Sequence, residues 1–236
     1  MTNSTKTPYA GHRFPPELIS YTVWLYFRFP LSLRMVEEML AFRGIEVSHE
    51  TIRQWGLKFG QEFANIIRRL PRPGDKWHLD KVVLKIAGRK HYLWRAVDQH
   101  GVVLDVLVQR RRDRKAAKRL LRKLLKRQCR APRVMITDKL KSYGAAKKEI
   151  MPGVEHRQHK GLNNRAENSH QPTRRRERQM KRFKSARQAQ RFLSAHDQIN
   201  NLFLLPRHLM PATDYRAERT RAFQAWHDVC GIKQAA

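Results

Sequence analysis

The sequence predicts an α/β protein in which a mixed sheet with flanking helices lies between two helical regions. Apolar residues recur at helical spacing over residues 15–70 and again over 161–236. Between these regions, residues 75–160 alternate strand-like runs with helix-like runs. The turn-forming sequence Arg-Pro-Gly-Asp at residues 72–75 separates the first region from the second and predicts a domain boundary.

The first region has the pattern of a helix-turn-helix domain. Helices are expected over Glu17–Arg28, Ser32–Gly44 and Ser48–Phe59, with the two serines as N-caps. A short glycine-containing turn followed by a capped helix is typical of this motif. The third helix would present side chains that can read base edges or hold phosphates, namely His49, Arg53, Gln54 and Lys58. A helical bundle with a charged outer face would show the same pattern.

The middle region has a recognisable order of elements. Residues 77–86, 90–98 and 102–108 are expected to form three strands joined by tight turns. A helix over 114–128, a short buried strand over 134–136 and a helix over 140–149 follow. This is the element order of an RNase H-like core. The predicted domains are a disordered start (1–14), the helix-turn-helix domain (15–70), the RNase H-like domain (75–205) and a helical tail (206–236).

The charge of the chain predicts a polyanionic partner. Lysine and arginine total 50 against 20 acidic residues, which gives a net charge of +30. Nucleic acid would relieve the resulting self-repulsion. Residues 110–127 hold eleven lysines and arginines and residues 174–187 hold eight, each with a single acid. Such segments favour surfaces that follow phosphates, although a solvated basic face or an RNA-binding protein would have a similar composition.

The cysteines and the hydropathy pattern indicate in which cellular compartment the protein is expected. Cys129 and Cys230 cannot form a disulfide framework and lie in no metal-binding spacing, which fits a reducing cytoplasm. No apolar run approaches the roughly 20 residues of a membrane helix. The first dozen residues lack the apolar core of a signal peptide, so we expect no secretion.

Three carboxylates stand at positions where chemistry is expected. Asp80 interrupts an apolar strand, Asp138 follows the short fourth strand, and Glu167 begins the next helical region. Each also has a structural explanation: an ion pair for Asp80, capping of the next helix for Asp138, and a capping box for Glu167. Together, three acids brought to one point would suit two Mg²⁺ or Mn²⁺ ions about 3.5–4 Å apart. Three further acids are explained by a turn, a strand and a helix start, namely Asp98, Asp105 and Asp113.

At these residues the sequence resembles the DDE transposases of the bacterial IS-six family. The matching stretches are residues 77–80 (Trp-His-Leu-Asp), 92–98 (Tyr-Leu-Trp-Arg-Ala-Val-Asp), 136–139 (Ile-Thr-Asp-Lys), 154–157 (Val-Glu-His-Arg) and 159–182. The resemblance also covers the helix-turn-helix pattern, and so spans nearly the whole chain. It implies that Asp80, Asp138 and Glu167 form the catalytic triad.

The neighbours of the triad carry further expectations. The expected DNA contacts are Lys139, Arg174, Arg175, Arg178, Lys181 and Arg182. The resemblance implies Arg174 in particular, because relatives often carry a DNA-contacting lysine or arginine there. Lys81 follows the first acid where relatives usually have glutamate, and strand alternation is expected to point it away from the face of Asp80.

The resemblance implies a transposase that binds the terminal inverted repeats of an insertion sequence. Metal-dependent hydrolysis would free a 3′-hydroxyl at each end of the element, and that hydroxyl would attack target DNA. Double-stranded DNA is the expected partner, and because two ends must be held together, a dimer or larger assembly is expected. The alternative from the residues is a non-catalytic DNA-binding protein, such as a decayed or domesticated transposase acting as a repressor.

Overall fold

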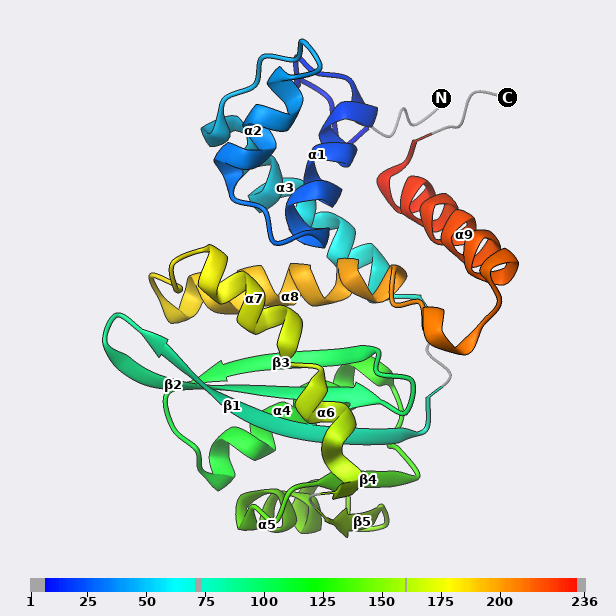
Figure 1. Cartoon of the computed structure of the whole chain (residues 1–236). Coiled ribbons are helices and arrows are strands. Elements are labelled where there is room, and N and C mark those ends of the chain that lie inside the picture. The colour runs from blue at the N-terminus through cyan, green and yellow to red at the C-terminus, as the bar shows by residue number, and fades with distance from the viewer. Residues whose placement is uncertain (1–6, 71–73, 160, 233–236) are drawn as a thin grey trace, which may run out of the picture. The chain divides into compact units, whose positions relative to one another are not determined.

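The computed structural model describes residues 7–70, 74–159 and 161–232, and the chain divides into two compact units (Figure 1). One unit consists of the N-terminal segment up to Leu70 together with the C-terminal segment from Ala195. The other consists of the residues that lie between these two segments in the sequence. The predicted turn at residues 72–75 falls near this division, but its first two residues lie outside the described part of the chain.

The helical unit is built from helices of both ends of the chain. Its elements are α1 (Pro16–Arg28), α2 (Leu33–Ala41), α3 (His49–Ile67), the short helix η2 (Arg207–Leu209) and α9 (Ala212–Cys230). Both predicted N-caps form, because the hydroxyl of Ser32 accepts from the backbone of Met35 at 3.1 Å and that of Ser48 from Thr51 at 3.3 Å. The third helix continues past its predicted end, because Phe63, Ala64 and Ile67 extend its buried face.

Aromatic side chains hold α9 against the N-terminal helices. The ring of Trp226 lies 5.3 Å from that of Phe63, and Phe223 lies 5.3 Å from Trp24 in an edge-to-face arrangement. Tyr9, in the segment expected to be a disordered start, is buried and donates to the carbonyl of Cys230 at 2.8 Å. The apolar residues of the predicted tail therefore serve packing within this unit.

The second unit contains a five-stranded sheet. Its strands are β1 (Lys76–Ile86), β2 (Arg89–Asp98), β3 (Val103–Gln109), β4 (Val134–Thr137) and β5 (Glu155–Gln158). The order across the sheet is β3-β2-β1-β4-β5, with β1–β2 and β2–β3 antiparallel and β1–β4 and β4–β5 parallel. This is the RNase H-like arrangement that the element order predicts. The edge strand β5 was not predicted, because it is short and its four residues are polar.

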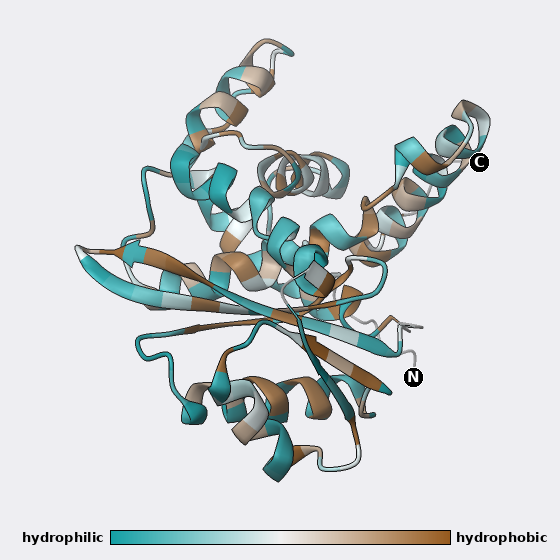
Figure 2. Cartoon of the chain, turned by 60° about the horizontal axis from the view of Figure 1, so that its bottom comes forward, coloured by the Kyte–Doolittle hydropathy of each residue, from teal (hydrophilic) through white to brown (hydrophobic). Residues whose placement is uncertain are grey.

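The main core of this unit lies on one face of the sheet. Helices α4 (Arg114–Gln128) and α5 (Lys141–Ile150) supply Leu120, Leu121 and Tyr143 to a cluster with Leu79 and Trp94 of the sheet. Figure 2 shows the corresponding brown segments in the strands and in the helices along them, interrupted by teal polar positions. The periodic leucines of α4 thus bury one side of a helix whose other side is strongly basic.

The opposite face of the sheet carries the segment that follows β5. This segment contains η1 (Gly161–Asn163), α6 (Asn164–Asn168), α7 (Gln171–Gln179) and the start of α8 (Ala186–Leu202), and the division between the units falls within α8. Successive strand side chains point to opposite faces, so Asp80 points away from the core face that Leu79 occupies. Within the described residues, no helix is long and apolar enough to cross a membrane.

Candidate active site

Asp80 lies near the middle of β1, on the face that receives α6 and α7. Its side chain is buried, and its Oδ2 lies 3.2 Å from Nε2 of His170, the residue that precedes α7. Asp80 is also the cross-strand partner of Arg95 in β2. A buried carboxylate needs compensating charge, and this structure provides basic groups beside it.

Arg95 ties the sheet to the α6–α7 junction. It is fully buried, and its guanidinium donates to the carbonyl oxygen of Ser169 and, at 2.6 Å, to Oγ1 of Thr173. The side-chain amide of Asn163 adds a second tie, since it donates at 3.0 Å to the carbonyl of Leu79. These contacts fix α6 across β1 and β2, next to the position of Asp80.

Glu167 is exposed and lies on α6, within the segment that Arg95 and Asn163 hold in place. The capping box considered for it is not observed, because the N-cap of α6 is Asn163 and makes no side-chain capping bond. Glu167 therefore lies on a helix that contacts β1 and β2, the strands that carry Asp80 and Arg95.

Asp138 directly follows β4. Its Oδ1 accepts from the backbone of Leu140 at 3.2 Å, and its Oδ2 accepts from the ammonium of Lys81. The helix-capping explanation for Asp138 is not observed either, because α5 begins at Lys141 with Leu140 as its N-cap. Both carboxylate oxygens instead serve the loop at the carboxyl end of β4 and the lysine from β1.

The contact between Lys81 and Asp138 is the feature of the site that the sequence did not reveal. Strand alternation places Lys81 on the face opposite Asp80, as expected, and this position brings its ammonium to Asp138. The register of β1 and β4 explains this contact, because Leu79 pairs with Thr137 and both Lys81 and Asp138 lie just beyond that pair.

The pKa of one buried tyrosine, Tyr143, is raised in part by both aspartates. Tyr143 of α5 is fully buried, and burial raises its pKa well above the usual value. The negative charges of Asp80 and Asp138 raise that pKa further. Independently of this pKa, the pairing of Leu79 with Thr137 places Asp80 and Asp138 at neighbouring positions of β1 and β4.

The three competing acids have structural partners. Asp98 accepts from the backbone of His100 at 2.8 Å and closes the β2–β3 turn, and Asp113 caps α4 through Ala116 at 2.9 Å. Asp105 is buried between two cations of α4, with Lys123 at 2.9 Å and Arg127 at 3.0 Å. Each of them thus has a structural role, in a turn, a helix cap or an ion pair.

Comparison with known proteins bears directly on this site. Residues 74–204 match the DDE domain of a transposase family. The chain is 32% identical over 168 residues to the transposase for the insertion sequence-like element IS431mec of Staphylococcus aureus, which covers 67% of this chain and 73% of the relative. It matches the transposase of insertion sequence element IS257 in transposon Tn4003 of the same species to the same extent.

The chain belongs to the IS-six family of bacterial DDE transposases. It is therefore an enzyme of DNA strand cleavage and strand transfer. Among solved structures, it is similar to the catalytic domain of Mos1 transposase, with 12% identity, a TM-score of 0.41, and coverage of 76% of this chain and 96% of that one. The HTLV-2 integrase catalytic core matches with 20% identity and a TM-score of 0.33 over 42% of this chain and 67% of that chain.

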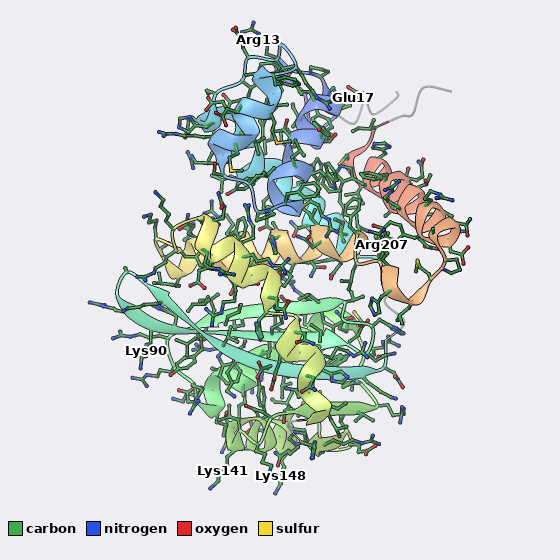
Figure 3. The ribbon with its side chains drawn as sticks, in the orientation of Figure 1. Arg13, Glu17, Lys90, Lys141, Lys148 and Arg207 are labelled. Atoms are coloured by element: carbon green, nitrogen blue, oxygen red, sulfur yellow. The ribbon has the colours of Figure 1, made fainter. Side chains whose placement is uncertain are left out.

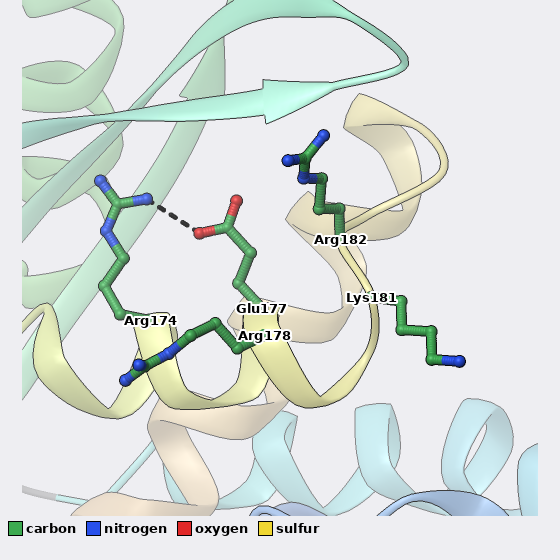
Figure 4. A pocket seen from close by; sticks show the side chains of 5 residues that line it. All are labelled: Arg174, Glu177, Arg178, Lys181 and Arg182. Atoms are coloured by element: carbon green, nitrogen blue, oxygen red, sulfur yellow. Dashed lines mark hydrogen bonds and ion pairs between the residues drawn. The ribbon is translucent and has the colours of Figure 1, made fainter.

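A groove on the transposase is lined by the basic residues predicted after Glu167. Arg174, Glu177, Arg178, Lys181 and Arg182 enclose a volume of about 680 Å³ at α7 and the turn after it (Figure 4). Arg174 donates to Glu177 at 2.8 Å and to the carbonyl of Val83 at 2.7 Å, so it joins α7 to β1. Arg178, Lys181 and Arg182 are exposed residues of its lining.

Other basic positions divide into paired and exposed groups. Several cations of the segment 110–127 meet acids that lie far from them in the sequence: Glu149 pairs with Arg114 and Lys118, and Asp105 with Lys123 and Arg127. Lys139 and Arg175 are exposed. Figure 3 shows Lys90 at the β1–β2 turn and Lys141 and Lys148 of α5 pointing outward. The exposed groups extend the basic surface of this unit.

On α3, the predicted base-reading side chains lie at the surface. Arg53 and Gln54 both bond to Glu50, whose pKa falls to about 2 chiefly because of the Arg53 hydrogen bond. His49 lies 3.5 Å from Glu37, and the ammonium of Lys58 lies 2.8 Å from the ring of His12. All four side chains are thus held in intramolecular contacts.

Proposed function

We propose that Asp80, Asp138 and Glu167 are the catalytic acids of this transposase and hold divalent metal ions, Mg²⁺ or Mn²⁺. The observation that carries this assignment is the parallel pairing of β1 with β4, in which Leu79 pairs with Thr137, so that Asp80 and Asp138 each lie one residue beyond that pair. Glu167 joins them from α6, which Arg95 and Asn163 tie to the same sheet. Carboxylate oxygens are the ligands that these hard cations prefer.

The donor set fits such ions in its chemistry, although the side chains do not stand as a closed ligand cluster. Within the described residues, no group of three or more histidine, cysteine, aspartate or glutamate side chains is arranged to hold a metal. Asp138 is engaged by Lys81 and Asp80 by His170. When bound, the ions would activate the attacking oxygen and neutralise charge that develops on the phosphate.

The remaining residues bind and orient DNA. The groove at Arg178, Lys181 and Arg182 lies on the segment that follows Glu167, so it would hold the backbone of the strand being cut. Lys139, Arg174 and Arg175 would add phosphate contacts. The helices α2 and α3 would recognise the terminal inverted repeats, and two copies of the chain would hold the two ends of the element in the bacterial cytoplasm.

A plasmid cointegration assay tests the acids. The gene is placed between its own flanking repeats and compared with Asp138→Asn and with Asp214→Asn, an exposed position on α9. We expect cointegrates from the wild type and from Asp214→Asn, and none from Asp138→Asn. Equal yields from all three would refute the assignment of Asp138, whereas no product from any of them would favour a non-catalytic DNA-binding protein.

A binding assay tests the role of α3. Gln54→Ala should reduce the preference for a terminal-repeat duplex over a scrambled duplex by about tenfold, because a bidentate base contact contributes about 1–3 kcal/mol to discrimination. Gln61→Ala, on the same helix, is the matched control. An unchanged preference in Gln54→Ala would remove this residue from the reading surface.

A further inference from the structure

Lys81 occupies an unusual place for a lysine. Its cross-strand partner is Trp94, and its side chain is only 10% exposed. On the same strand, Lys85 is exposed. Burying the stem and head of a lysine is unfavourable unless the charge meets a partner, and here the partner is Oδ2 of Asp138.

The position of Lys81 in the sheet explains why its partner is Asp138. The pair lies beyond the last β1–β4 pairing of Leu79 with Thr137, so the ammonium reaches across the carboxyl end of β4. Asp138 is 25% exposed, and its other oxygen is held by the backbone of Leu140. Each of the two carboxylate oxygens of Asp138 thus has a partner from the protein.

We propose that Lys81 is a built-in counter-cation of Asp138 that lowers the affinity of the acid site for divalent metal ions. This inference rests on the metal-binding role proposed above for Asp138. An ammonium and a divalent ion at the same carboxylate repel each other at contact distance. A bound metal ion must either bear that repulsion or displace Lys81, so the ion pair raises the metal concentration at which the site fills.

The test is a Mn²⁺ titration of the full-length protein without DNA, with free Mn²⁺ counted by electron paramagnetic resonance. Lys81→Met keeps the apolar stem and removes the charge, Lys81→Arg keeps the charge, and Lys85→Met is the matched control on the same strand. We expect Lys81→Met to bind Mn²⁺ about tenfold more tightly than the wild type. Lys81→Arg and Lys85→Met should bind no more tightly than the wild type.

Two further measurements keep the proposal separate from folding and from the proposed function. Without metal, Lys81→Met should melt at a lower temperature than the wild type, and the difference should shrink as Mn²⁺ is added, because binding stabilises the folded state. Adding Asp138→Asn to Lys81→Met should abolish the gain in affinity.

The possible outcomes distinguish the role of Lys81 from the proposed metal site itself. Unchanged affinity in Lys81→Met, together with weaker binding in Asp138→Asn, would overturn the role of Lys81 and leave the metal site standing. Loss of Mn²⁺ binding in Lys81→Met while its circular dichroism spectrum stays native would also overturn it. If neither the wild type nor any folded variant binds Mn²⁺, both this inference and the proposed metal role fail.

Discussion

Replacing Arg95 by methionine should loosen the α6–α7 junction from the sheet. Arg95 is 1% exposed and bonds to the carbonyl of Ser169 and the hydroxyl of Thr173. A hydrogen bond to a charged group contributes about 1.5–3 kcal/mol, so losing both should cost roughly 3–6 kcal/mol of the free energy of unfolding. Thr173→Val removes only one of these bonds and should cost about 1.5–3 kcal/mol.

A double-mutant cycle isolates the contact between the two side chains. If they interact as the structure shows, Arg95→Met combined with Thr173→Val should cost less than the sum of the single changes, by about 1.5–3 kcal/mol. The free energy is measured for this unit by hydrogen exchange of β2 and α7 amides in a urea series. Additive effects, or a cost below about 1 kcal/mol for Arg95→Met, would refute the reasoning.

Three other results are expected. Asp105→Asn should destabilise the sheet unit by about 2–3 kcal/mol in urea unfolding. The change breaks the ion pairs of a buried carboxylate with Lys123 and Arg127, whose own side chains are partly exposed. A change within about 0.5 kcal/mol would contradict this. Burial lowers the pKa of His156 below 6.5, so the unfolded state binds more protons. The contribution of neutral His156 to the free energy of unfolding should therefore be fully present above about pH 6.5 and be lost as the pH falls further. In urea unfolding at pH 8 and pH 5, His156→Gln should lose less stability between the two pH values than the wild type. Finally, Arg175→Glu with Arg178→Glu should weaken binding to all duplexes alike and reduce the salt slope measured by fluorescence anisotropy by about 2; an unaltered slope would exclude phosphate contacts at these residues.

Much of the secondary structure could be predicted because its causes are local. The hydroxyls of Ser32 and Ser48 cap helices through residues three positions away, and the leucines of α4 recur at helical spacing. The length of α3 was underestimated, because its last two turns are stabilised by partners elsewhere, including Trp226. The strand β5 was missed because its four residues are polar, and because it is held by pairing with β4, whose residues lie elsewhere in the chain.

The candidate site, too, could be predicted in part from the sequence and in part only from the structure. The positions of Asp80, Asp138 and Glu167 followed from the element order and from the family motifs, and their catalytic role stays a prediction. The alternatives of a helix cap for Asp138 and a capping box for Glu167 could be decided only from the structure, because they depend on where α5 and α6 begin.

The sequence by itself determined the family, the basic character and the order of elements, since these depend on composition, motifs and short-range periodicity. Only the tertiary structure decided which charges meet. Lys81 and Asp138 are 57 positions apart, and Arg95 and Thr173 are 78 apart. Such pairs depend on strand register and on the side of the sheet that each helix covers, and a single side chain's neighbours in the chain carry no information on either.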